Sequence, residues 1–220
     1  RIGQGPIFKA NEGVLKHCNN RHSNYIDNLK VHGIHPSEID IVMCTHLHAD
    51  HVGWNTKLVN NRWVPTFPNA KYLFSSTEIE SMKKETTNPF DEYTRLVYED
   101  SILPIIESGQ AVIIDESIDL GTGINLIKSP GHSPGHCCIE VNGHNRKGLL
   151  TGDVLHNPIQ VVCPGMSTMF CDDKELSNQT RINLVNELTD SETVILAAHF
   201  GDTTAGLIES NDQERQFRLI

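Results

Sequence analysis

Short apolar runs, separated by turns rich in Gly, Pro and Asn, alternate with polar segments along the whole chain. Runs of this length, bounded by turn residues, are typical of buried strands. They predict strands at 39–44, 70–74, 111–114, 124–128, 137–141, 148–151 and 193–198. The second half of the chain is therefore the part richer in strands.

Helical spacing of apolar residues occurs between these runs. It predicts a short helix around Tyr25–Leu29 that ends near Gly33, and a helix from Ser76 to about Glu85. A third helix covers 91–108 with a bend at Pro104, and an amphipathic helix covers 173–188. The expected core positions of that last helix are Leu176, Ile182, Leu184, Val185 and Leu188. Residues 1–20 and 55–69 show no period and predict loops, so the whole pattern indicates α/β sheets covered by helices.

Composition narrows the class of protein. A chain of 220 residues with 38% apolar residues suits one domain, which we place at 1–220. No apolar run approaches the roughly 20 residues that span a membrane. The net charge of −10 argues against nucleic acid or an anionic membrane as a main partner, and a small-molecule substrate is compatible with it. A homodimer is compatible with all of this.

Cysteine usage favours a reducing compartment. The six cysteines form no Cys-x-x-Cys pair, and Cys137 and Cys138 lie in an apolar run where they are expected to be small core residues. No secretory signal precedes them, although the chain begins with Arg1. These features favour a cytoplasmic location.

The densest chemistry follows the predicted strand at 39–44. Residues 46–51, His-Leu-His-Ala-Asp-His, hold three histidines and one aspartate in six positions. Burying that many polar rings beside an apolar strand costs several kcal/mol unless each ring finds a partner. Imidazole nitrogens and carboxylate oxygens are ligands for zinc, iron, manganese and cobalt, so the cluster predicts a divalent metal site.

Three later strand ends add ligand types of the same kind. His132 lies in the loop Ser-Pro-Gly-His-Ser-Pro-Gly-His after the strand at 124–128, Asp153 follows the strand at 148–151, and His199 follows 193–198. With the first cluster they make seven candidate ligands, which suits two ions better than one. His156, three residues past Asp153, is left open between a substrate contact and an ordinary loop residue. Trp54, Trp63, Phe67 and Phe170 are likewise left open between a substrate pocket and ordinary packing.

The order His-x-His-x-Asp-His, Gly-His, Gly-Asp and a late strand-end His resembles the metallo-β-lactamase superfamily. The resemblance implies an αββα sandwich with two divalent ions, most often Zn²⁺, with Mn²⁺, Fe²⁺ or Co²⁺ as alternatives. It assigns His46, His48 and His132 to the first ion, and Asp50, His51 and His199 to the second. Asp153 bridges the two in this scheme, and His136 plays a supporting role.

This resemblance implies hydrolysis. Two ions that share a water lower its pKa toward neutrality and produce a hydroxide nucleophile, while Asp50 also handles a proton. His48 stands where flavodiiron oxidoreductases usually carry Glu, which argues against redox chemistry. The strings at 45–55, 152–156, 158–160 and 198–200 look closest to lactonase-like and methyl-parathion-hydrolase-like members.

The substrate expected from that branch is an acyl-homoserine-type lactone or a related ester. Organophosphate triesters and β-lactams are the alternatives within the fold, and a non-catalytic metal-binding protein is the alternative outside enzymes. Members of the family usually begin with two or three strands before the first helix. Here none is recognisable ahead of residue 39, so we expect either that the chain is a fragment of a longer gene product or that its N-terminal sheet is incomplete.

Overall fold

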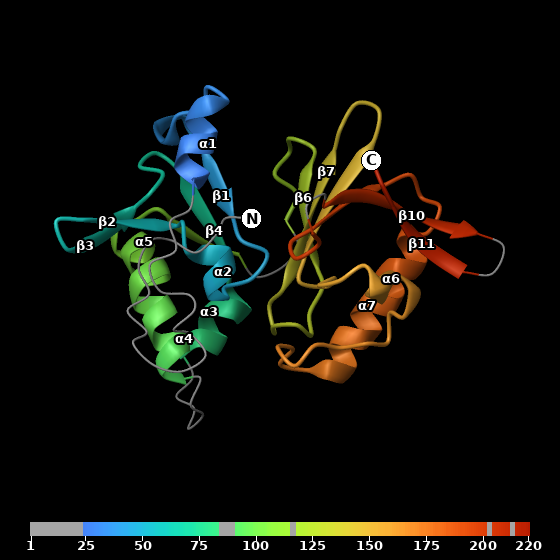
Figure 1. The fold of residues 1–220 in the computed structure, drawn as a ribbon. Coiled ribbons are helices and arrows are strands. Elements are labelled where there is room, and N and C mark those ends of the chain that lie inside the picture. The colour runs from blue at the N-terminus through green and yellow to red at the C-terminus, as the bar shows by residue number, and fades with distance from the viewer. Residues whose placement is uncertain (1–23, 84–90, 115–117, 202–203, 212–213) are drawn as a thin grey trace. The chain divides into compact units, whose positions relative to one another are not determined.

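The computed structural model describes residues 24–83, 91–114, 118–201, 204–211 and 214–220 (Figure 1). It contains two compact units, Arg1–Ile113 (unit 1) and Ile114–Ile220 (unit 2). The expectations for residues 1–20 and for the missing N-terminal strands fall outside the described residues. The placement of one domain over 1–220 stays a prediction.

Unit 1 alternates short helices and strands in the order that the apolar pattern predicts. The elements are α1 (Tyr25–Val31), a 3₁₀ turn (Pro36–Glu38), β1 (Ile41–Met43), α2 (Ala49–Val52), β2 (Thr56–Val59), β3 (Arg62–Pro65), β4 (Lys71–Ser75), α3 (Ser76–Lys83), α4 (Asp91–Val97), η3 (Tyr98–Ile102), α5 (Leu103–Glu107) and β5 (Ala111–Ile114). Three of its strands form a sheet in the order β1-β4-β5, with β1 and β4 parallel and Val42 opposite Tyr72. In Figure 1, α3, α4 and α5 lie together beside this sheet.

The core of unit 1 joins the sheet to those helices. Tyr72 and Phe74 of β4 pack with Ile79 of α3 and with Ile102 and Ile105, and each of these side chains is at most 5% exposed. Burial of an aromatic or branched side chain of this size stabilises the fold by about 1.5–3 kcal/mol. The end of β1 that leads to residues 46–51 is therefore supported by a well-packed core.

Two details of unit 1 differ from the sequence prediction. Residues 55–69 contain the β2–β3 hairpin, in which Leu58 pairs with Trp63. Asn60 and Asn61 turn it with φ of 51° and 60°, and two residues in this conformation give the tight turn that suits strand twist. The helix at 91–108 is present, but a π-helical segment interrupts it at Tyr98–Ile102, two residues before Pro104, which lacks the N–H of a regular turn.

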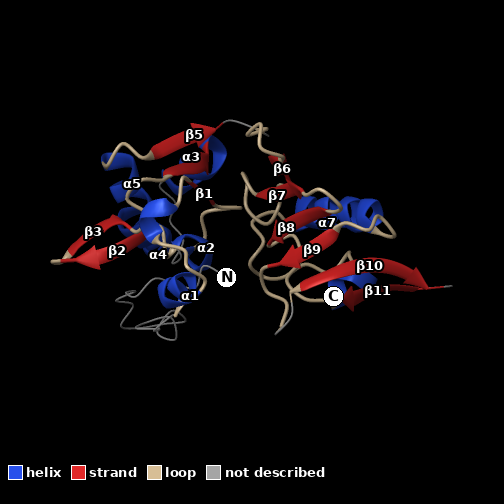
Figure 2. Ribbon diagram, turned by 90° about the horizontal axis from the view of Figure 1, so that it is seen from above, coloured by secondary structure: helices blue, strands red, loops and turns tan. Residues whose placement is uncertain are grey.

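Unit 2 is a six-stranded sheet with the order β11-β10-β9-β8-β7-β6. Its elements are β6 (Ile124–Lys128), β7 (Cys137–Asn142), β8 (Lys147–Gly152), α6 (Ile159–Val162), α7 (Lys174–Leu188), β9 (Val194–Ala197), β10 (Ala205–Asn211) and β11 (Glu214–Leu219). β8 and β9 are parallel, with Gly152 opposite Ala197, and α7 connects them. Figure 2 shows α7 alongside the sheet. The predicted strands are all confirmed, while the hairpin β10–β11 was not predicted.

Helix α7 begins at an N-cap, where the side chain of Asp173 accepts a hydrogen bond from the N–H of Leu176. Val185 and Leu188 are buried as predicted, against Leu149 and Ile195 of the sheet. The prediction for Leu176 is wrong, because this side chain is 41% exposed. The helix instead buries Ser177 and Arg181, and the guanidinium of Arg181 bonds to carbonyls in loops 15–27 residues earlier in the sequence.

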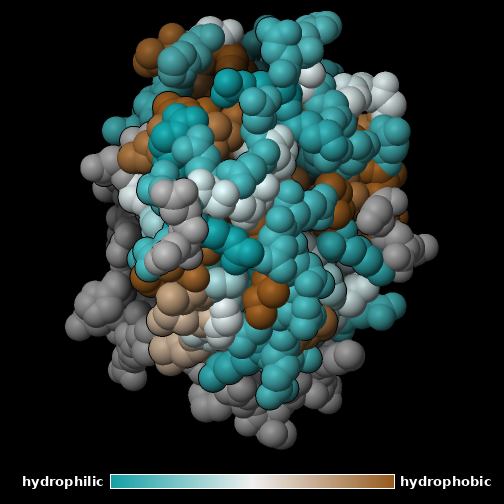
Figure 3. Space-filling model, turned by 90° about the vertical axis from the view of Figure 1, so that its right-hand side faces the viewer, coloured by the Kyte–Doolittle hydropathy of each residue, from teal (hydrophilic) through white to brown (hydrophobic). Residues whose placement is uncertain are grey.

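The fold is that of an α/β protein with helices on its sheets, as expected. None of the helices in the described ranges combines the length and the hydropathy that a bilayer-spanning segment needs. On the face drawn in Figure 3, apolar residues form several small patches between hydrophilic ones. Cys137 and Cys138 are buried, as predicted for small core residues.

Candidate metal centre

In unit 1, the cluster at 46–51 occupies the loop after β1 and the short helix α2. His46 is 1% exposed, and its Nε2 lies 3.1 Å from Nδ1 of His48, while Thr45 Oγ1 lies 3.1 Å from His46 Nδ1. With zinc bonds of about 2.0–2.2 Å, the corners of a tetrahedral site lie about 3.3–3.6 Å apart. The two facing ring nitrogens are near the spacing of ligands that share an ion.

The second pair of this cluster lies on α2. His51 Nε2 is 3.4 Å from Asp50 Oδ2, and the rings of His46 and His51 are 4.0 Å apart between centroids. The side chain of Asp50 is 39% exposed, so a substrate or solvent can reach it. All four predicted ligands of unit 1 thus lie in the loop after β1 and in helix α2.

Long-range contacts hold this loop in place. The backbone N–H of Leu47 donates to Oε2 of Glu78 at 2.9 Å, and Glu78 is 4% exposed on α3. Beneath the loop, the Cys44 thiol donates to Oδ1 of Asn55 at 3.6 Å. Burial raises the pKa of this thiol to about 12, so it remains uncharged at neutral pH. Glu78 was known from the sequence only as part of a helix start, and nothing in the local pattern indicated its contact with residue 47.

In unit 2, three histidines surround one carboxylate oxygen. Oδ2 of Asp153 lies 3.3 Å from Nε2 of His132, 3.2 Å from Nε2 of His156 and 3.1 Å from Nε2 of His199. Asp153 and His132 are 3% and 2% exposed. The structure therefore brings together the three predicted ligands of this unit, and adds His156 to them.

The loop of His132 is fixed by its packing against the start of α7. Gly131 has φ of 124°, and a Cβ there would stand 2.3 Å from the backbone nitrogen of Ser177. The carbonyl oxygens of Gly131 and His132 accept the N–H groups of Asp173 and Asp172, each at 3.0 Å. Only glycine permits this approach of the loop to α7.

His136 supports the site as a positioning residue. It is fully buried, and its Nε2 accepts the backbone N–H of Asp153 at 3.0 Å. Its Nδ1 lies 2.8 Å from Ser129 Oγ, and the Cys138 thiol donates to that same oxygen at 3.2 Å. Because Nε2 is an acceptor here, the proton of the neutral ring is on Nδ1 and points to Ser129. The supporting role expected of His136 agrees with these contacts.

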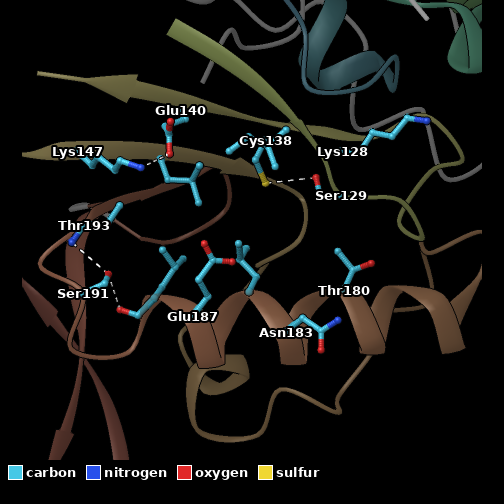
Figure 4. A pocket seen from close by; sticks show the side chains of 14 residues that line it. Lys128, Ser129, Cys138, Glu140, Lys147, Thr180, Asn183, Glu187, Ser191 and Thr193 are labelled. Atoms are coloured by element: carbon cyan, nitrogen blue, oxygen red, sulfur yellow. Dashed lines mark hydrogen bonds and ion pairs between the residues drawn. The ribbon is translucent and has the colours of Figure 1, made fainter. Parts of the chain in front are cut away.

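Ser129 and Cys138 also belong to the wall of a cavity of about 490 Å³ between β6–β8 and α7 (Figure 4). Its rim carries the ion pair of Lys147 and Glu140, with Nζ 2.8 Å from Oε2. The hydrogen bond from Lys147 lowers the pKa of Glu140. Neither Asp153 nor any histidine is among the described residues that line this cavity.

Arg181 connects α7 to the loops that carry the ligands. The side chain is 0% exposed, and its Nε donates to the carbonyl of Val154 at 2.8 Å. Its terminal nitrogens donate to the carbonyls of Pro164 and Met166 and to Ser177 Oγ. The guanidinium of Arg181 thereby anchors Val154, the residue after Asp153. The sequence pattern did not predict this role for Arg181.

The aromatic candidates separate into packed and exposed residues. Phe67 is 2% exposed and belongs to the core of unit 1, so packing explains it. Trp54 contacts Tyr25, with ring centroids 5.8 Å apart. Phe170 is 63% exposed and, with Met166 and Met169, gives the segment after α6 an apolar surface.

The family model of the metallo-beta-lactamase superfamily matches residues 11–199. An N-acyl homoserine lactonase of Bacillus thuringiensis is 30% identical over 108 residues, which are 49% of this chain and 35% of that protein. A Bacillus cereus N-acyl homoserine lactonase is 29% identical over the same length. The matched region thus spans only about a third of these curated relatives.

Solved structures share the fold. The hydrolase AbOPH of the beta-lactamase superfamily has a TM-score of 0.81 at 23% identity, covering 94% of this chain and 73% of its own. A probable metal-dependent hydrolase from Staphylococcus aureus has a TM-score of 0.80 at 20% identity, covering 100% and 75%. The dizinc quorum-quenching lactonase AidC has a TM-score of 0.75 at 19% identity, covering 92% and 71%.

Proposed function

Because the chain belongs to the metallo-β-lactamase superfamily, we propose that it is a dinuclear metal-dependent hydrolase that opens an acyl-homoserine-type lactone or a related ester. Partial similarity to N-acyl homoserine lactonases supports this substrate class. The donor set supports a metal-dependent reaction, since it consists of imidazoles and carboxylates of the kind that zinc accepts.

The observation that carries the proposal is the environment of Asp153. Its Oδ2 lies within 3.3 Å of three imidazole nitrogens, and a carboxylate among convergent rings is a strong site for a divalent cation. Ligands that share an ion lie at about this separation. The residues present therefore fit the metal that the family implies.

The ligand assignment follows the order of motifs in the family. We assign to it His46, His48, Asp50, His51, His132, Asp153 and His199. Zn²⁺ is the preferred ion, with Mn²⁺, Fe²⁺ and Co²⁺ as alternatives that the same donors accept.

The chemistry divides between the ions and the protein. Bound divalent ions supply Lewis acidity and a water of lowered pKa at neutral pH. Asp50, with an exposed carboxylate, is placed to accept a proton or pass it to the departing alkoxide. His136 holds the backbone of Asp153, and Glu78 holds the loop between His46 and His48, so both ligand groups are set before substrate arrives.

The test is a metal analysis followed by a substrate panel. The purified chain should bind divalent ions, and with zinc, manganese or cobalt supplied it should open acyl-homoserine lactones. Asp153→Asn should lower kcat/KM by at least about 100-fold and reduce the bound metal. The matched control is His144→Gln, an exposed histidine of the same unit, which should change neither quantity.

Two results would overturn the proposal. One is a chain that holds no divalent ion, and the other is a metal-loaded chain that opens no lactone or ester. Phosphotriesters and β-lactams belong in the same panel, because preferential cleavage of either would move the chain to another branch of the superfamily. Light scattering would check the prediction of a homodimer, and fractionation of the source cells would check the predicted cytoplasmic location.

A further inference from the structure

His156 lies beside Asp153 but outside the ligand order of the family. Its Nε2 is 3.2 Å from Asp153 Oδ2, and its side chain is 13% exposed. Its ring stacks on His199 with planes 7° apart and centroids 5.4 Å apart, and its centroid is 4.9 Å from that of His132. The ring is therefore enclosed by the other candidate ligands of unit 2.

The side chain of Gln160 fixes the backbone of His156. The N–H of His156 donates to Oε1 of Gln160 at 2.7 Å, and Gln160 is 3% exposed. Nε2 of Gln160 donates in turn to the carbonyl of Met166, which also accepts a bond from Arg181. A buried amide and a buried guanidinium thus hold the segment that aims the imidazole at Asp153.

The hydrogen-bonding capacity of the His156 ring is not satisfied by the described residues. Both ring nitrogens are shielded from solvent, and neither makes a hydrogen bond with a described residue. The contact of Nε2 with Asp153 has the length of a hydrogen bond but not its alignment. Leaving such a nitrogen buried without a partner costs about 1–3 kcal/mol, and two ligands of a common cation show this kind of close, unaligned contact.

We propose that His156 is a metal ligand and completes, with His132 and Asp153, a three-ligand site for a divalent cation made entirely by unit 2. One ligand atom from each of these three residues lies within 4.8 Å of the others. Two imidazoles and one carboxylate leave a fourth position open, as catalytic zinc sites do. The inference rests on the proposed metal-dependent function, but it makes ion binding by unit 2 independent of residues 46–51.

The first experiment measures Co²⁺ binding to a full-length background variant that lacks ligands in unit 1, His48→Gln/Asp50→Asn/His51→Gln. This variant should still bind one Co²⁺ per chain in equilibrium dialysis. Adding His156→Gln should weaken that binding at least about tenfold, whereas adding His144→Gln should leave it unchanged. Circular dichroism and the thermal transition of the metal-free proteins check that each variant is folded.

The second experiment looks for a new absorption band instead of weaker metal binding. In an otherwise unchanged chain, His156→Cys offers a thiolate, which zinc-type ions bind readily. With Co²⁺ added, this variant should show a thiolate-to-cobalt charge-transfer band that the unchanged chain and His144→Cys lack.

The outcomes separate this inference from the proposed function. If the unchanged chain binds Co²⁺ and opens lactones, while His156→Gln binds it equally well and His156→Cys shows no band, His156 is only an ion-pair partner of Asp153 and the inference is wrong. If the unchanged chain binds no Co²⁺, the proposed function fails as well. Activity of His156 variants decides neither point, because a substrate contact would also lower it.

Discussion

The backbone N–H of Asp153 donates to Nε2 of His136 at 3.0 Å, and the side chain of His136 is fully buried. This bond sets the direction in which the carboxylate leaves the end of β8. His136→Ala should therefore lower the free energy of unfolding by about 2–3 kcal/mol and weaken metal binding about 10–100-fold. Urea unfolding and competition with a chelator measure the two effects; unchanged metal affinity in a folded variant would contradict the positioning role.

Gly131→Ala should be among the most damaging small substitutions. The added Cβ would meet the backbone of Ser177 at 2.3 Å, and the positive φ adds strain, so we expect a loss of about 3 kcal/mol or more and displacement of His132. Gly121→Ala is the control, since φ is 70° there and no atom lies within 4 Å. Thermal unfolding should show a loss of only about 1–2 kcal/mol for the control.

Glu78→Gln tests the support of the first cluster. The variant replaces the buried carboxylate that accepts the N–H of Leu47, and we expect a loss of about 1–2 kcal/mol together with weaker metal binding. Glu80→Gln, on the exposed side of the same helix, should have no effect on either quantity. Equal behaviour of the two variants in calorimetry and dialysis would remove Glu78 from the site.

Arg181 should tolerate no truncation. Arg181→Ala removes the guanidinium donor from the carbonyls of Val154 and Pro164 and leaves the carbonyl of Met166 with Gln160 as its donor, so we expect the free energy of unfolding to fall by at least about 3 kcal/mol. Arg181→Lys keeps the charge but not the fork of donors, so it should recover only part of this loss. Full recovery by lysine in urea unfolding would show that charge alone matters.

The ion pair of Lys147 and Glu140 at the cavity rim predicts that the free energy of unfolding depends weakly on pH in the acid range. The hydrogen bond from Lys147 lowers the pKa of Glu140 below its ordinary 4.5, so the stabilisation is complete above that value and disappears as pH falls through the folded-state pKa. Lys147→Met should cost less than about 1 kcal/mol at neutral pH, because the lysine is half exposed. The difference from the unchanged chain should vanish in acid, as urea unfolding at several pH values would show.

The strands and the ligand motif could be predicted because their signals are local. His46, His48, Asp50 and His51 share one short segment, and the apolar run before them marks a strand. The hairpin β10–β11 escaped notice because most of its second strand is polar, Glu-Arg-Gln-Phe-Arg-Leu, which hides the alternation of a half-exposed edge.

Supporting residues could not be predicted for a different reason. Arg181 occupies a place in α7 where a charged residue ordinarily faces water, and its carbonyl partners lie 15–27 residues away. Glu78 contacts a backbone group 31 residues earlier. Such contacts depend on how loops pass over a helix, and neither periodicity nor composition encodes that path.

The parallel pairing of β8 with β9 has a consequence for how the chain can vary. Asp153 and His199 are 46 residues apart in sequence, yet each follows a strand whose last residues, Gly152 and Ala197, are partners in the register. Adjacent strands lie about 4.8 Å apart whatever connects them. Strand pairing thus sets the distance between these two side chains, so the number of residues between them can change as long as the register and the contacts of Gln160, Ser177 and Arg181 are kept.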